Sequence, residues 1–125
     1  MNRLLWIALG GAFGALARHS TAAVCERLLG AQLPWGTFAV NALGSFLLGV
    51  LVEGFARSDA VSPGVQAMWV TGFLGAFTTF STYSVQSVRL AERGDYGWAA
   101  ANVLGNVVVG LALAALGIAL SRRFV

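Results

Sequence analysis

Four long stretches with few charges occupy most of this 125-residue chain and constrain its fold more than any other feature. They cover residues 4–28, 35–55, 64–88 and 97–120. Each is close to the ~20 residues that an α-helix needs to cross about 30 Å of hydrocarbon. Charged residues make up only 10% of the chain, against about one-quarter of an ordinary soluble domain. We therefore predict an all-α membrane protein, in which residues 1–125 form a single domain of four transmembrane helices.

The first stretch allows a second interpretation, a cleaved signal peptide. Arg3 precedes an apolar run, and Ala15 and Ala17 resemble the small residues before a cleavage site. Against this, Gly10 and Gly14 form the small-xxx-small pattern that packs membrane helices together. Removal of the segment would also leave only three spans, so we favour a first transmembrane helix.

The basic residues suggest membrane anchoring and an undecided orientation. All eight are arginines, and they are scattered singly, without the basic cluster typical of nucleic-acid binding. With the N-terminus inside, the cytoplasmic set would be Arg3, Arg57, Arg122 and Arg123, against Arg27, Arg89 and Arg93 outside. Four against three gives almost no positive-inside bias. We expect insertion in both orientations and pairing of two opposed copies; one dominant arginine that sets a single orientation is the alternative.

Polar residues recur on one face of the second and fourth spans. Thr37, Asn41 and Ser45 follow one another at intervals of four, and so do Asn102 and Asn106. Hydrogen bonds between helices would explain any one of these residues. Taken together with the polar run of the third span, they favour a path for a small polar solute.

The third span contains an uncharged run of hydroxyls and aromatic rings, residues 72–84 with the sequence GFLGAFTTFSTYS. Near a bilayer midplane water cannot satisfy these hydroxyls, so they need internal partners or a hydrated path. Gly72 and Gly75 would let the helix unwind and would free carbonyl oxygens for a cation. A continuous helix is equally compatible with the sequence.

The chain's potentially reactive side chains occur singly, and we do not expect an enzyme. Cys25 has no partner for a disulfide within the chain, and His19 lacks a partner at metal-ligand spacing. No nucleophile–base pair or phosphate-binding glycine loop is recognisable. Arg18 lies 14 residues into the first span, where it either reaches the interface along its flexible stem or attracts anions within the membrane.

Three motifs together resemble the small bacterial fluoride channels of the Fluc (CrcB) family. They are residues 10–18 (GGAFGALAR), 36–46 (GTFAVNALGSF) and the run at 72–84. The resemblance extends over essentially the whole chain. It implies a fluoride-specific channel in the bacterial inner membrane, crossing it several times. Such a channel exports cytoplasmic fluoride passively and so confers fluoride resistance.

The same resemblance implies a dual-topology antiparallel homodimer with two pores and a broken third helix. It implies a structural sodium ion (Na+) at the dimer centre, held by the main-chain carbonyls of Gly75 and Thr78. Arg18 corresponds to the family's first-span arginine. The fluoride-contacting residues it implies are Asn41, Phe80, Ser81, Thr82, Tyr83 and Asn106. Membrane lipid is the other expected partner, and no nucleic acid is expected.

Two positions depart from the family pattern. Tyr83 stands where a second phenylalanine is usual, so either its ring edge or its hydroxyl would face the ion. Asn102 and Asn106 stand where tyrosine or hydroxyl residues are expected, although both still donate hydrogen bonds.

Two other functions remain as alternatives. A small dual-topology multidrug exporter needs a carboxylate deep in the first span, where this chain has Arg18 and where Glu26 comes too late. A non-transporting scaffold protein would need only the glycine-rich faces that pack helices.

Overall fold

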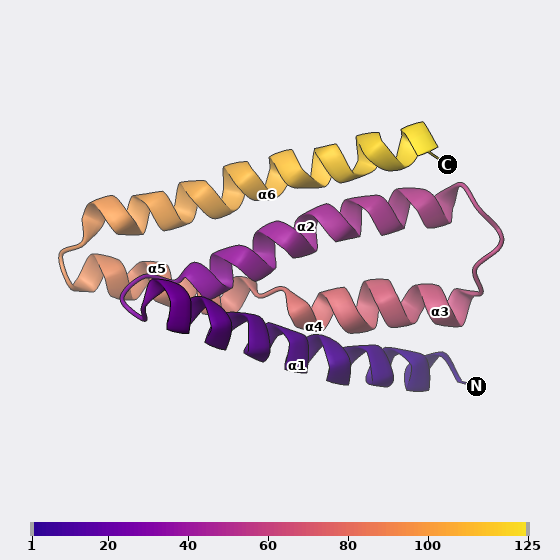
Figure 1. Cartoon of the computed structure of the whole chain (residues 1–125), viewed down its shortest axis with the longest axis horizontal. Helices are drawn as coiled ribbons and strands as arrows, with labels where there is room; N and C mark the ends of the chain where they lie inside the picture. The colour runs from indigo at the N-terminus through magenta and orange to yellow at the C-terminus, as the bar shows by residue number, and fades with distance from the viewer. Residues whose placement is uncertain (1, 125) are drawn as a thin grey trace.

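Four helical rods run alongside one another in the computed structural model, which describes residues 2–124. The elements are α1 (Arg3–Leu29), α2 (Trp35–Ala56), α3 (Pro63–Ala67), the π-helix η1 (Met68–Leu74), α4 (Gly75–Phe77), α5 (Phe80–Glu92) and α6 (Tyr96–Phe124). The elements from α3 to α5 follow one another along the third rod, and both ends of the chain lie at the same end of the molecule (Figure 1). Residues 2–124 contain no strand, so the all-helical prediction is confirmed.

The helices begin and end at residues suited to those positions. The Asn2 side chain accepts a hydrogen bond from the Leu4 amide at the start of α1, and Gly30, with a φ of 87°, ends that helix. Ser62 caps α3 in the same way, with Pro63 in its first turn. These local signals divide the chain into its rods.

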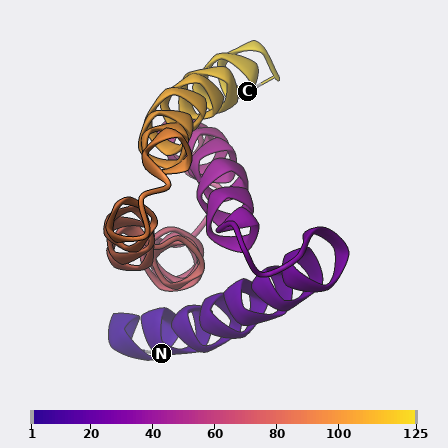
Figure 2. The same ribbon diagram turned by 90° about the vertical axis from the view of Figure 1, so that its left-hand side faces the viewer.

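Seen from one end, α1 and α6 lie on opposite sides, with α2 and the third rod between them (Figure 2). Glycines allow backbones to meet at both outer contacts. A Cβ added at Gly10 would strike the carbonyl oxygen of Met68, and one at Gly117 would strike that of Phe46. Such close approach is typical of membrane helices, which pack through small residues.

The small core lies between α2 and the third rod. Val40, Leu74 and Phe77 are its buried residues, and the rings of Phe73 and Phe77 stack with their centres 5.8 Å apart. Much of the exterior is apolar, with Leu104, Leu111 and other large side chains exposed. An apolar exterior of this extent suits lipid rather than water.

Among the described helices, α2 and α6 are each long and apolar enough to cross a membrane. They have 22 and 29 residues. The third rod differs, because its first half contains the π-helix η1 between α3 and α4, and two residues between α4 and α5 are not helical. Thr78 and Thr79 have extended backbone there, with φ of −84° and −151°.

Candidate functional site

The Asn41 side chain bridges the non-helical step between α4 and α5. Its Oδ1 accepts a hydrogen bond of 2.8 Å from the Thr79 amide, and its Nδ2 donates to the Thr79 carbonyl oxygen over 3.1 Å. Thr79 is buried, and a buried backbone group without a partner is costly. Asn41 thus supplies from α2 the partners that Thr79 lacks within its own rod.

A line of hydrogen bonds continues from Asn41 across α6 to α5. Asn41 Nδ2 also donates to Asn106 Oδ1 over 3.0 Å. The Asn106 amide group in turn donates to Asn102, whose carbonyl oxygen and Oδ1 lie 2.9 and 3.1 Å away. Asn102 Nδ2 donates to Ser87 Oγ over 2.9 Å, and Ser87 donates to the Tyr83 carbonyl oxygen over 2.8 Å. We call Asn41, Asn106, Asn102 and Ser87 the amide relay.

The amide relay carries no charge, and Asn41 and Asn106 use both of their amide donors. An asparagine amide group has two N–H donors. Asn41 donates one hydrogen bond to Thr79 and one to Asn106, and Asn106 donates both of its hydrogen bonds to Asn102. An anion that binds to the Asn41 amide must therefore take the place of one of its present acceptors.

An open groove of about 260 Å³ runs beside this site. Its walls include Asn41, Ser45, Asn106, Phe80 and Tyr83. Phe80 is 79% exposed, and the centre of its ring lies 5.4 Å from that of Tyr83. Neutral amide groups and aromatic rings therefore face one shared space.

Tyr83 is buried and directs its hydroxyl toward α6. The hydroxyl lies 3.5 Å from the Val103 carbonyl oxygen on α6, a long hydrogen bond. The centre of its ring lies 5.4 Å from that of Phe80. The geometry therefore favours the ring over the hydroxyl as the part of Tyr83 that faces the groove.

Ser81 and Thr82 lie at the start of α5, exposed, and neither is among the residues that line the groove. The Thr82 amide donates to Thr79 Oγ1 over 3.3 Å, which caps the helix. The Thr79 hydroxyl donates to Thr82 Oγ1 over 3.0 Å. Within one chain these hydroxyls are thus separate from Asn41 and Asn106.

Arg18 reaches the non-helical step from the opposite side. Its Nη1 lies 3.5 Å from the Thr78 carbonyl oxygen, and the residue is half-buried. The Thr78 hydroxyl donates to the Leu74 carbonyl oxygen over 3.0 Å. Gly75, one turn earlier, is exposed. The guanidinium group thus places positive charge beside this step.

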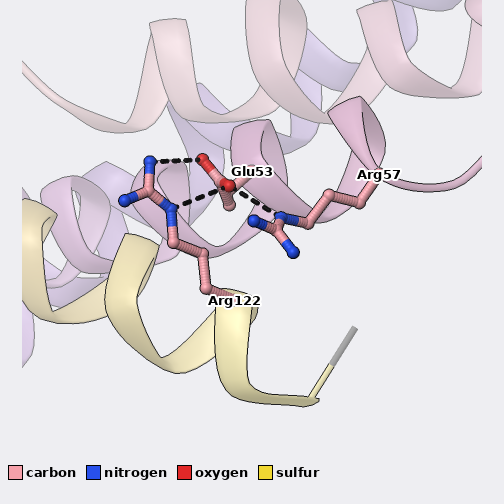
Figure 3. Close-up of polar contacts among 3 residues, drawn as sticks. All are labelled: Glu53, Arg57 and Arg122. Carbon is pink, nitrogen blue, oxygen red and sulfur yellow. Dashed lines mark hydrogen bonds and ion pairs between the residues drawn. The ribbon is translucent and has the colours of Figure 1, made fainter.

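A second polar cluster, of different character, joins the far ends of α2 and α6 (Figure 3). Glu53 Oε1 accepts from Arg57 Nε over 2.8 Å and from Arg122 Nε over 2.9 Å. Both arginines are exposed, and they reach the carboxylate from just after the end of α2 (Arg57) and from α6 (Arg122) (Figure 3). We call Glu53, Arg57 and Arg122 the charged cluster.

The sequence interpretation missed two residues of the site, Thr79 and Ser87. Both share a spacing signal with a residue that was singled out, because Thr79, Tyr83 and Ser87 follow one another at intervals of four. On a continuous helix that spacing would place them on one face. Their partners, Asn41 on α2 and Asn102 on α6, show the same spacing within their own spans, but no signal in the sequence pairs them with Thr79 and Ser87.

Comparison with known proteins identifies the family. The family model described as "CrcB-like protein, Camphor Resistance (CrcB)" matches residues 5–118. A protein of Syntrophotalea carbinolica named "Fluoride-specific ion channel FluC" is 48% identical over 120 residues, which cover 96% of this chain and 98% of that protein. A Sorangium cellulosum protein of the same name is 40% identical over 125 residues, covering 100% and 98%. The resemblance inferred from the three motifs is confirmed: the chain belongs to the CrcB family.

Proposed function

We propose that this protein is a fluoride-specific ion channel that lets fluoride leave the cytoplasm passively. Relatives with that name align with this chain over nearly their whole length. The observation that carries the proposal is the groove at the non-helical step, where the uncharged amides of Asn41 and Asn106 and the ring of Phe80 meet. This is the arrangement expected for a small anion that must shed water.

The chemistry of the groove suits fluoride. Fluoride is small and accepts hydrogen bonds strongly, so neutral N–H donors replace part of its hydration without retaining it as a full charge would. The edge of an aromatic ring is positive and adds a weak attraction for an anion. Chloride is larger and a poorer acceptor, and it gains less from the same donors.

Two opposed copies would complete the pore, as the resemblance implies. Phe80, Ser81 and Thr82 are exposed in a single chain whose exterior is otherwise largely apolar. Polar side chains that face lipid cannot hydrogen-bond to water there, and their exposure is costly. A second copy that covers this segment would bring Ser81 and Thr82 next to a groove and remove that cost. The nearly balanced arginines support opposite orientations.

A structural sodium ion fits the donor chemistry only in part. Main-chain carbonyl oxygens are neutral oxygen ligands of the kind that hard cations take. Gly75 and Thr78 would supply two from each chain, so a fuller shell requires the second copy. The Arg18 guanidinium lies 3.5 Å from the Thr78 oxygen and would have to turn away from the ion.

The membrane potential would supply the driving force. We place the protein in the bacterial inner membrane, with α1, α2, the third rod and α6 crossing it. An inside-negative potential favours anion exit by about 2.3 kcal/mol per 100 mV for each charge. Conduction along this path breaks no covalent bond, and α1 offers only Glu26, near its end, as the carboxylate that a proton-coupled drug exporter needs.

The deciding experiment is fluoride efflux from liposomes that contain the purified protein, followed with a fluoride electrode. We expect rapid efflux that needs a potassium ionophore, with chloride retained. Phe80→Ile removes the ring from the groove and is expected to abolish efflux while the protein remains dimeric. A folded dimer of the unsubstituted protein that releases no fluoride would overturn the proposed function.

A further inference from the structure

The amide relay has a fixed direction, set at its buried end. The Tyr83 carbonyl oxygen can only accept, so the Ser87 hydroxyl donates to it and offers its oxygen to Asn102. Asn102 must then turn its Nδ2 toward Ser87 and its Oδ1 toward Asn106. If the side-chain amide of Asn102 or Asn106 were flipped, its NH₂ group would face the NH₂ group of a neighbouring asparagine.

The consequence reaches the groove through Asn106. With its Nδ2 held by Asn102, Asn106 presents its Oδ1 to Asn41. Ser87 and Asn102 are each 8% exposed. Water is therefore largely kept from the buried end, so it does not compete for the hydrogen bond between these two residues. At the groove end, Asn106 is only half-buried and borders open space.

We propose that Ser87 and Asn102 are positioning residues for ion passage. They hold the Asn106 oxygen on the Asn41 amide, at the position that an anion takes when it binds there. The Asn106 oxygen is a neutral acceptor, so an anion displaces it from the N–H group. The relay returns it when the ion leaves. The positioning itself stands on hydrogen-bond geometry, and its role in permeation rests on the proposed function.

The side-chain amides of asparagine give a direct test, because the chain has only four asparagines. Three of them belong to the amide relay, and Asn2 lies at the start of α1 as an internal reference. Full-length protein labelled with ¹⁵N-asparagine is recorded by NMR with and without sodium fluoride. We expect Ser87→Ala to shift the side-chain signals of Asn106 and Asn41, neither of which it touches. A shift confined to Asn102 would overturn the relay.

The matched control is Ser121→Ala on α6. Ser121 is also a buried serine, but its hydroxyl has no hydrogen-bond partner among the described residues and lies outside the relay. This variant is expected to leave the signals of Asn41 and Asn106 unchanged. Asn102→Leu serves as the second relay variant should Ser87→Ala fold poorly, and the Asn41 signal is its readout.

Flux supplies the functional arm. Ser87→Ala is expected to lower fluoride efflux about two- to tenfold, the range for loss of one net hydrogen bond, whereas Ser121→Ala does not. Fluoride is expected to shift the Asn41 and Asn106 signals of the unsubstituted protein and to leave Asn2 in place. Unchanged efflux in Ser87→Ala would refute the positioning role. If the unsubstituted protein carries no fluoride, the proposed function fails, while coupled NMR shifts would still establish the relay.

Discussion

The α2–α6 pair is joined by two polar clusters that differ in charge, burial and position. The amide relay crosses the middle of the pair through Asn41 and Asn106, with neutral groups only. The charged cluster joins the ends of the helices, where Glu53 meets Arg57 and Arg122. Both connect the same helices over similar distances, 3.0 Å in the middle and 2.9 Å at the end.

The difference shows how the cost of charge varies along a helix pair. At the end of the pair, exposed guanidinium groups keep their contact with water, so an ion pair forms there without heavy desolvation. In the middle, an ionised group would lose its contact with water, and interactions with the protein would not fully compensate for that desolvation. Amides avoid that cost because they supply donors and acceptors to one another. A neutral acceptor can also yield to an anion, which a carboxylate would repel.

Replacement of Asn41 should have the largest effect. Asn41→Leu removes three hydrogen bonds and leaves the buried Thr79 amide without its partner. We expect fluoride efflux to fall at least about 100-fold and the protein to unfold more easily. Ser45→Ala, on the same face of α2, is the comparison and should cost far less. Equal losses would mean that any polar change in the groove is enough.

A charge placed in the middle should come next. Asn106→Asp keeps an oxygen for Asn41 but puts an anion beside the groove, and we expect about tenfold slower efflux at pH 7.5 from repulsion of fluoride. Acidification protonates the carboxyl group and removes the charge, so relative efflux should recover toward pH 5.5. Protein-free liposomes correct for leakage of hydrogen fluoride. Full activity at pH 7.5 would contradict the need for a neutral centre.

The spacing between the helices should matter less. A Cβ at Gly117 would strike the Phe46 carbonyl oxygen, whereas one at Gly105 would meet only the Phe38 ring, at 3.5 Å. Gly117→Ala is expected to destabilise the fold by about 1–3 kcal/mol through overpacking. Gly105→Ala should be neutral or slightly stabilising, because alanine favours the helix. Thermal unfolding in detergent compares them, and equal midpoints would show that the helices separate freely.

The charged cluster should matter least. Glu53→Gln keeps the shape and one carbonyl oxygen but removes the charge that both arginines share. Since exposed ion pairs contribute little and salt screens them, we expect a small drop in the unfolding midpoint at low salt that vanishes in 0.5 M salt. Fluoride efflux should not change. A loss as large as that of Gly117→Ala would reverse the comparison between the two clusters.

The sequence predicted many of the residues of the site but not the contacts that they make with one another. Spacing placed Asn41 on one face of its helix and Asn106 on one face of another, and the family resemblance connected them with a pore. Asn41 hydrogen-bonds to Thr79, 38 residues away along the chain, and to Asn106, 65 residues away. Both bonds depend on packing that brings these distant segments together. Ser87 escaped notice because its partner, Asn102, lies across the turn between two helices.

The sequence by itself determined the helical rods, the apolar exterior and the family, because these follow from local length, composition and motif order. Only the tertiary structure decided which way each amide points. It turned the Tyr83 hydroxyl toward α6, and it left Ser81 and Thr82 on the outside of a single chain. The physical reason is that a hydrogen bond has a direction only when both partners are in place. Those partners come from helices that only packing brings together.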